Sequence, residues 1–174
     1  MMLNQKYNLI QTRILVGLLC FLVILCFTQL VSAQEDPPRP LEVYTYQNLS
    51  FGAIIQGNSG GEVRIDPQGS RSVTGDLILA NMGHQYGPAV FEIVANPGSV
   101  ITINNGPDIE LTGSNGGTLT LHIGTSLPTS PFVNTSTPPY RTQVRVGGIL
   151  SVGNSLHNPS GDYIGYFSIT FVQQ

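Results

Sequence analysis

The feature of this sequence that most limits its fold is the regular return of turn-forming residues between short apolar runs. From Leu41 onwards, clusters of Gly, Asn, Pro and Ser recur at intervals of about 8 to 12 residues, and the runs between them alternate apolar and polar side chains. In a half-buried β-strand, every second side chain enters the core. Apolar residues at helical spacing are not found in this part of the chain. The sequence therefore predicts an all-β domain, folded as an immunoglobulin-like two-sheet β-sandwich.

The strand pattern also predicts where the chain turns. We expect strands at residues 42–47, 49–55, 61–65, 70–73, 76–80, 89–95, 99–103, 109–112, 118–123, 142–152 and 163–172. Turns are expected at residues 58–61, 66–69, 96–98, 104–107 and 114–117, where Gly, Asn and Pro supply the required backbone angles. Residues 124–140 contain four prolines and little periodicity, which predicts a long surface loop. Such a loop is either a binding feature or a simple crossover between the sheets.

The first 33 residues have the pattern of a secretory signal. Lys6 and Arg13 precede an apolar run at residues 14–27, which suits a signal and is shorter than the roughly 20 residues of a membrane-spanning helix. Small residues lead up to Ala33, so we expect the signal helix to be removed by cleavage between Ala33 and Gln34. The alternative is an uncleaved anchor. An exported protein of this kind is periplasmic, on the cell surface or extracellular.

Signal removal changes the composition of the remaining chain. Cys20 and Cys26 both lie in the signal, so residues 34–174 contain no cysteine, and the domain depends on its core and its strand ladders. Residues 34–40 include three prolines and read as a linker that leads into a domain at residues 41–174. Five arginines, no lysine and ten acidic residues give this part a formal net charge of −5. This charge argues against nucleic acid and anionic membranes as partners. We also expect no membrane insertion after signal removal.

Catalytic and metal-binding motifs are scarce. The three histidines, His84, His122 and His157, are far apart and have no motif around them, and no thiolate accompanies them as a zinc ligand. A small hydrolase would need His122 or His84 beside a serine and an acid. The glycine pairs are not followed by the lysine or the helix of a phosphate-binding loop. We therefore predict no catalytic residue, no metal site, no cofactor and no enzymatic activity.

Three stretches taken in order carry a family resemblance: residues 49–52 (LSFG), residues 61–71 (GEVRIDPQGSR) and residues 161–171 (GDYIGYFSITF). Together they resemble the bacterial domain-of-unknown-function family 4402, which is similar to fimbrial and pilus-type subunits of Gram-negative bacteria. The resemblance implies an assembly role for the C-terminal strand, in which a glycine opens an alternating apolar run formed by Gly161, Tyr163, Gly165, Phe167, Ile169 and Phe171. The penultimate tyrosine common in such subunits is replaced here by Gln173.

The sequence thus predicts an exported, non-enzymatic, fimbrial-like structural or adhesive protein. Its expected partners are other fimbrial-like subunits or a periplasmic chaperone, joined by strand addition. A donor segment would have to alternate without proline, whereas Leu41, Val43 and Thr45 alternate only briefly behind the prolines. The terminal strand alternatively closes its own sheet and does nothing else. A second hypothesis is a carbohydrate- or ligand-binding module that uses residues 124–140 and the tyrosines Tyr140 and Tyr86, whose ring faces stack on sugars.

Overall fold

The computed structural model describes residues 39–174. These residues form thirteen strands and no helix, which confirms the predicted all-β fold. The signal segment, the cleavage site at Ala33 and Gln34, and linker residues 34–38 lie outside the described residues. Within them, no helix is long and apolar enough to cross a membrane. The strands are β1 (Glu42–Gln47), β2 (Ser50–Phe51), β3 (Ala53–Ile65), β4 (Arg71–Ala80), β5 (Tyr86–Gly87), β6 (Ala89–Val94), β7 (Val100–Asn105), β8 (Ile109–Gly113), β9 (Thr118–Leu127), β10 (Phe132–Val133), β11 (Thr142–Val152), β12 (Tyr163–Ile164) and β13 (Ile169–Gln173).

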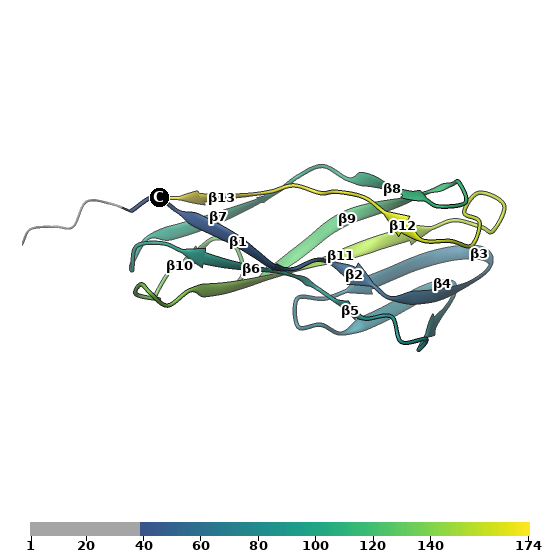
Figure 1. The fold of residues 1–174 in the computed structure, drawn as a ribbon, viewed down its shortest axis with the longest axis horizontal. Coiled ribbons are helices and arrows are strands. Elements are labelled where there is room, and N and C mark those ends of the chain that lie inside the picture. Colours follow the sequence, from purple (N-terminus) through teal and green to yellow (C-terminus); the bar gives the residue numbers. More distant parts are fainter. Residues whose placement is uncertain (1–38) are drawn as a thin grey trace, which may run out of the picture. The chain divides into compact units, whose positions relative to one another are not determined.

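Most of these strands belong to one large antiparallel sheet (Figure 1). Its order is β1-β6-β11-β9-β8-β12, and β3 pairs with both β11 and β4. β7 lies between β10 and β13 in a separate three-stranded sheet, and β2 pairs with β5. β11 has neighbours on both edges, because β6 and then β3 follow one edge while β9 follows the other.

Two glycines allow β11 to change partners along one edge. β6 pairs with residues 142–146 of β11, and β3 pairs with residues 148–152. A Cβ on Gly147 would collide with the Ile65 carbonyl oxygen, and a Cβ on Gly148 would come within 2.8 Å of the Leu49 side chain. Gly147 therefore lets the end of β3 approach β11 where pairing with β6 stops, and Gly148 leaves room for the Leu49 side chain.

The core lies between the two main sheets and is built from alternate positions of the strands. In β9, Leu119, Leu121 and Ile123 are buried while the residues between them are exposed, as the sequence alternation predicts. β11 contributes Val144 and Val146, and further core residues are Val63, Ile65, Leu77, Ile93, Ile101, Leu111, Leu150 and Val152. Burial of these side chains is the main source of stability in a domain whose described residues contain no cysteine.

The hairpin of β3 and β4 is longer than the sequence predicts. The predicted turn at residues 66–69 is confirmed, and there the Gly69 N–H donates to the Asp66 carbonyl oxygen at 3.0 Å. The predicted break at residues 58–61 is wrong, because these residues form a bulge inside the ladder. The Asp76 carboxylate accepts hydrogen bonds from the Asn58 and Ser59 backbone N–H groups at 2.7 and 3.3 Å. The bulge therefore keeps its backbone donors satisfied, and the ladder resumes beyond it.

Residues 124–140 are more ordered than the predicted surface loop. β9 continues to Leu127, and β10 forms within the segment and pairs with β7. Asn134 is buried, its Nδ2 donates to the Ala95 carbonyl oxygen at 2.9 Å, and the Thr142 hydroxyl donates to its Oδ1 at 2.6 Å. The segment is therefore tied to the ends of β6 and β11, and the predicted surface loop is reduced to residues 128–131 and 134–140.

The β3–β4 hairpin offers a matched test of this core. Ile65 is 1% exposed, whereas Ile78 on the neighbouring strand is 63% exposed. We expect Ile65→Ala to lower the free energy of unfolding by about 2 to 5 kcal/mol, because it leaves a cavity in the core. Ile78→Ala should lower it by less than about 1 kcal/mol. Urea denaturation measures both values, and equal effects would contradict the assigned core.

Candidate strand-accepting seam

The C-terminal strand, with its six predicted assembly residues, is divided between two sheets. β12 pairs with β8 in the large sheet, and β13 pairs with β7 in the three-stranded sheet. Gly161 lies in the exposed turn before β12, and Gly165 lies in the unpaired stretch between β12 and β13. A Cβ on Gly165 would come within 2.5 Å of Leu111 Cδ2 and 3.2 Å of the Glu110 carbonyl oxygen. The strand therefore passes close to β8 as it leaves the large sheet.

Alternation along this strand continues through the crossing. Tyr163, Phe167, Ile169 and Phe171 pack against the core, whereas the side chains between them are exposed. The inward residues are only partly buried. The strand thus belongs to its own domain, but its core-facing side chains are incompletely covered.

The end of β13 lies close to the start of β1, and the two strands diverge from there (Figure 1). The Gln173 Nε2 atom donates to the Arg39 carbonyl oxygen at 3.5 Å, and the rings of Phe171 and Phe91 meet edge to face at 5.5 Å. However, β1 pairs only with β6 and β13 pairs only with β7 among the described strands. We call this border between β1 and β13, along which no backbone ladder forms, the open seam.

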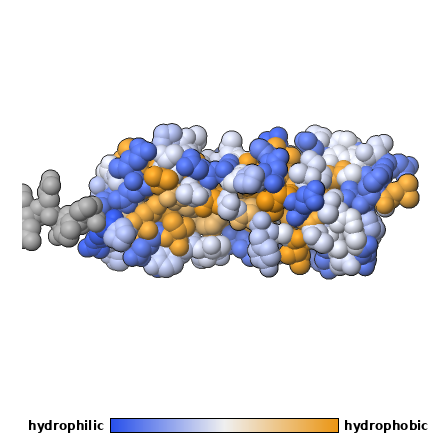
Figure 2. Space-filling model, turned by 90° about the horizontal axis from the view of Figure 1, so that it is seen from above, coloured by the Kyte–Doolittle hydropathy of each residue, from blue (hydrophilic) through white to orange (hydrophobic). Residues whose placement is uncertain are grey.

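The core-facing side of β1 is exposed at the open seam. Val43 lies opposite Ile93 in the ladder, so both side chains point to the same face of the sheet. Ile93 is 1% exposed, but Val43 is 42% exposed. Every residue of β1 is exposed, although an ordinary edge strand of a sandwich buries every second side chain. Seen from above, the face that carries β13 has a band of apolar residues along its middle (Figure 2).

The three histidines, which a hydrolase or a zinc site would have needed, are all exposed. The Asp108 carboxylate lies 2.6 Å from His122 Nδ1 with both side chains exposed, and His157 Nδ1 lies 2.7 Å from Asn154 Oδ1. His84 is exposed as well. Among residues 39–174, no histidine hydrogen-bonds to a serine hydroxyl, and no group of three acidic, histidine or cysteine side chains is placed to hold a metal ion.

A shallow depression of about 490 Å³ lies beside the last residues of β11. Its lining is Gly117, Thr118, Thr120, Ser151, Val152, Gly153, His157 and Asn158. The buried Asn158 side chain accepts a hydrogen bond from the Gly153 N–H and donates to the Thr118 carbonyl oxygen. These bonds hold the loop after β11 in place, and they occupy the one buried polar side chain of the depression.

The two tyrosines predicted to bind a ligand lie in different settings. Tyr86 forms part of β5, and the Arg71 guanidinium lies 4.1 Å from the centre of its ring. Tyr140 is the last residue of the segment 124–140 and is exposed. The sequence gives no sign of the cation–π contact between Tyr44 and Arg141, whose guanidinium lies 4.1 Å from the Tyr44 ring centre. Only strand register reveals this contact, because the two residues are almost one hundred positions apart.

Comparison with known families identifies one match. A family model described as "Domain of unknown function (DUF4402)" matches residues 41–172, which agrees with the resemblance seen in the sequence. No curated protein and no solved structure matches the chain.

The open seam predicts a specific pattern of hydrogen exchange. Amides of β11 are paired along both edges, whereas those of β1 that face the seam have no strand partner. We expect these β1 amides to exchange on the order of 100-fold faster than β11 amides in the isolated domain. Residue-resolved NMR exchange measures the difference, and uniform protection along β1 would show that the seam is already closed.

Proposed function

The chain belongs to the DUF4402 family, and we propose that its domain is a fimbrial-like structural subunit whose open seam accepts an extended segment of another protein chain. The exposure of Val43 on the core-facing side of β1 is the observation that carries this proposal. A domain that was complete by itself would cover this side chain with a neighbouring strand. An added strand would supply that cover.

Strand addition would satisfy the backbone and the side chains together. The edges of β1 and β13 offer N–H and C=O groups to a strand that runs between them, and alternate side chains of that strand would face Val43 and Phe171. Fully burying one aliphatic or aromatic side chain contributes roughly 1.5 to 3 kcal/mol. An alternating apolar segment of five or six residues would therefore bind with useful affinity after the cost of ordering it.

Gln173 supplies a second observation at the end of the seam. Its Nε2 donates to the Arg39 carbonyl oxygen, while its Oε1 is buried without a hydrogen-bond partner among the described residues. A buried acceptor without a partner costs about 1 to 3 kcal/mol. A backbone N–H from an added strand would satisfy it.

The proposed partners follow from this mode of binding. They are other fimbrial-like subunits, or a periplasmic chaperone that occupies the seam before assembly. The protein would act outside the cytoplasm, as its signal-like first 33 residues indicate, and its role would be structural rather than enzymatic.

A charge placed in the open seam tests the proposal. Val43→Arg puts a guanidinium on the core-facing side of β1, where a donor strand would need an apolar contact. The matched control is Ile164→Arg, because Ile164 is 68% exposed and belongs to the outward positions of the terminal strand. We expect Val43→Arg to remove the chain from high-mass assemblies recovered from the cells that produce it, and Ile164→Arg to leave those assemblies unchanged.

The molar mass from light scattering and the melting temperature are measured together. Both variants should remain folded, because both side chains are already substantially exposed. A folded Val43→Arg chain that assembles like the wild type would contradict the proposal. So would a wild-type chain that is monomeric in every cell fraction.

A further inference from the structure

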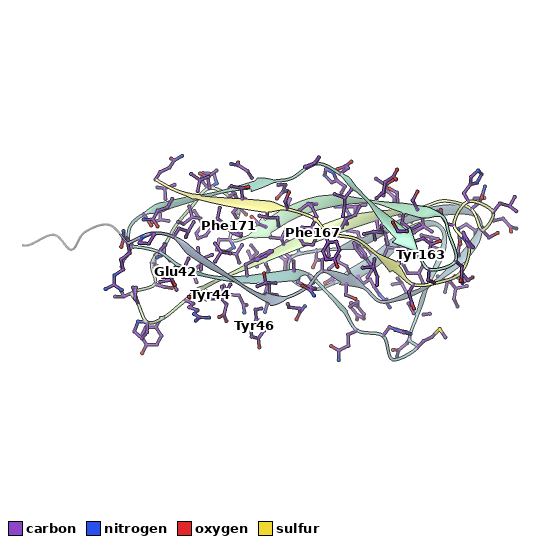
Figure 3. The ribbon with its side chains drawn as sticks, turned by 45° about the horizontal axis from the view of Figure 1, so that its top comes forward. Glu42, Tyr44, Tyr46, Tyr163, Phe167 and Phe171 are labelled. Carbon is purple, nitrogen blue, oxygen red and sulfur yellow. The ribbon has the colours of Figure 1, made fainter. Side chains whose placement is uncertain are left out.

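The outer face of the large sheet at β1, β6 and β11 carries a row of polar and aromatic side chains. Tyr44 lies opposite Glu92, and Glu92 lies opposite Gln143, so the three residues form one row across three strands. Tyr44 alternates with Val43 and therefore points away from the core-facing side of β1. In Figure 3, Tyr44 and Tyr46 lie on the side of β1 away from Phe167 and Phe171.

Tyr44 is held in place by its neighbours. Its hydroxyl donates to Glu42 Oε2 at 2.6 Å, and the Arg141 guanidinium covers one face of the ring. Arg141 Nη1 in turn lies 2.9 Å from Glu92 Oε2. The hydrogen bond to the Glu42 carboxylate raises the pKa of Tyr44 above its ordinary value. The ring is thus fixed on the surface although it contributes nothing to the core.

More aromatic surface lies close to this row. Tyr46, in the bulged part of β1, is 70% exposed, and Tyr140, which directly precedes Arg141, is 76% exposed. Tyrosine rings present a large, rigid area at a low entropic cost, and rings already held in position lose little freedom on binding. Tyr46 and Tyr140 thus add exposed rings within two chain positions of Tyr44 and Arg141, where one ring, an arginine and carboxylates are already held in place.

We propose that this outer face of β1, β6 and β11 binds a neutral polysaccharide. Tyrosine faces stack on the C–H faces of sugar rings, while the Arg141 and Glu92 groups offer donors and acceptors to sugar hydroxyls. Glu42 and Glu92 balance Arg141 and Arg145 in charge, so the face favours an uncharged ligand over an anionic one. The face lies on a sheet without enclosing walls, which suits a chain of sugars rather than a single sugar.

This site goes beyond strand addition and does not depend on it. The sugar would contact the outer side of β1, whereas a donor strand would occupy its edge and its core-facing side. A subunit could therefore hold both partners at once. The site also differs from the loop at residues 124–140 that the sequence suggests, because Tyr140 is the only residue of that segment that it uses.

Affinity electrophoresis of the exported chain in gels containing laminarin, galactomannan, xyloglucan or soluble starch tests the proposal. We expect at least one of these neutral polysaccharides to retard the wild-type protein. Tyr46→Ala and Tyr44→Ala should each weaken binding roughly 10-fold, because each removes one stacking surface. The matched control Tyr166→Ala removes a 92% exposed tyrosine from the terminal strand and should bind like the wild type.

Two further comparisons distinguish sugar binding at this site from strand addition at the open seam and from non-specific binding. Val43→Arg should retain sugar binding even though it loses assembly, so the two proposals fail independently. Alginate, an anionic polysaccharide, should not retard the chain. Absence of retardation by all four neutral polymers, retardation by alginate alone, or unchanged binding by folded Tyr46→Ala would each overturn the proposal.

Discussion

Backbone pairing along β11 is the constraint on which the rest of the domain depends. This strand is satisfied along both edges, by β6 and β3 on one side and β9 on the other, and it contributes Val144, Val146, Leu150 and Val152 to the core. Buried backbone N–H and C=O groups must find partners, so a strand at this depth fixes the positions of its neighbours. The requirement weakens toward the margins of the sheet, where β1 keeps only one partner. The open seam lies at this margin, where the ladder ends and the core-facing side of β1 is exposed.

The sequence predicts the strands well where alternation is strong. The predicted bounds of β1 and β11 agree with the structure, and the alternation of Leu119, Leu121 and Ile123 correctly identifies the core face of β9. It fails where turn-forming residues occur without a turn. Asn58, Ser59 and Gly60 have turn chemistry, but the carboxylate of Asp76 holds them as a bulge within one long hairpin. That contact is made across a ladder and leaves no local signal.

The candidate sites are less visible in the sequence than the fold. Alternation in the terminal strand correctly predicts which of its side chains face inward, but it does not show that the strand changes sheets or that β13 remains unpaired with β1. Likewise, Asn134 in a proline-rich segment gives no sign that it is buried and bonded to Thr142. Contacts such as Tyr44 with Arg141 arise from register, which a one-residue shift would abolish. Strand identity is thus encoded locally, whereas pairing and exposure depend on the whole topology.

The two faces of β1 suggest how an assembled subunit would also make a surface contact. Because side chains alternate along a strand, one short segment places Val43 on the core-facing side, where the proposed donor strand would bind, and Tyr44 on the outer side. If both proposals hold, the two contacts need no additional domain, and they would account for the exposure of Val43, Tyr44 and Tyr46 in β1. The polar clusters around His122 and His157 lie on strands and loops outside the open seam, and neither proposal uses them.

The most direct test is site-specific photo-crosslinking in cells that produce the protein. A photoreactive amino acid replaces Val43 in one variant and Ile164 in another, and mass spectrometry identifies the crosslinked peptide. Strand addition at the open seam predicts that position 43 crosslinks to an alternating apolar segment of another protein chain, and that position 164 does not. Crosslinks from position 43 only to its own domain, or equal crosslinking from both positions, would contradict it.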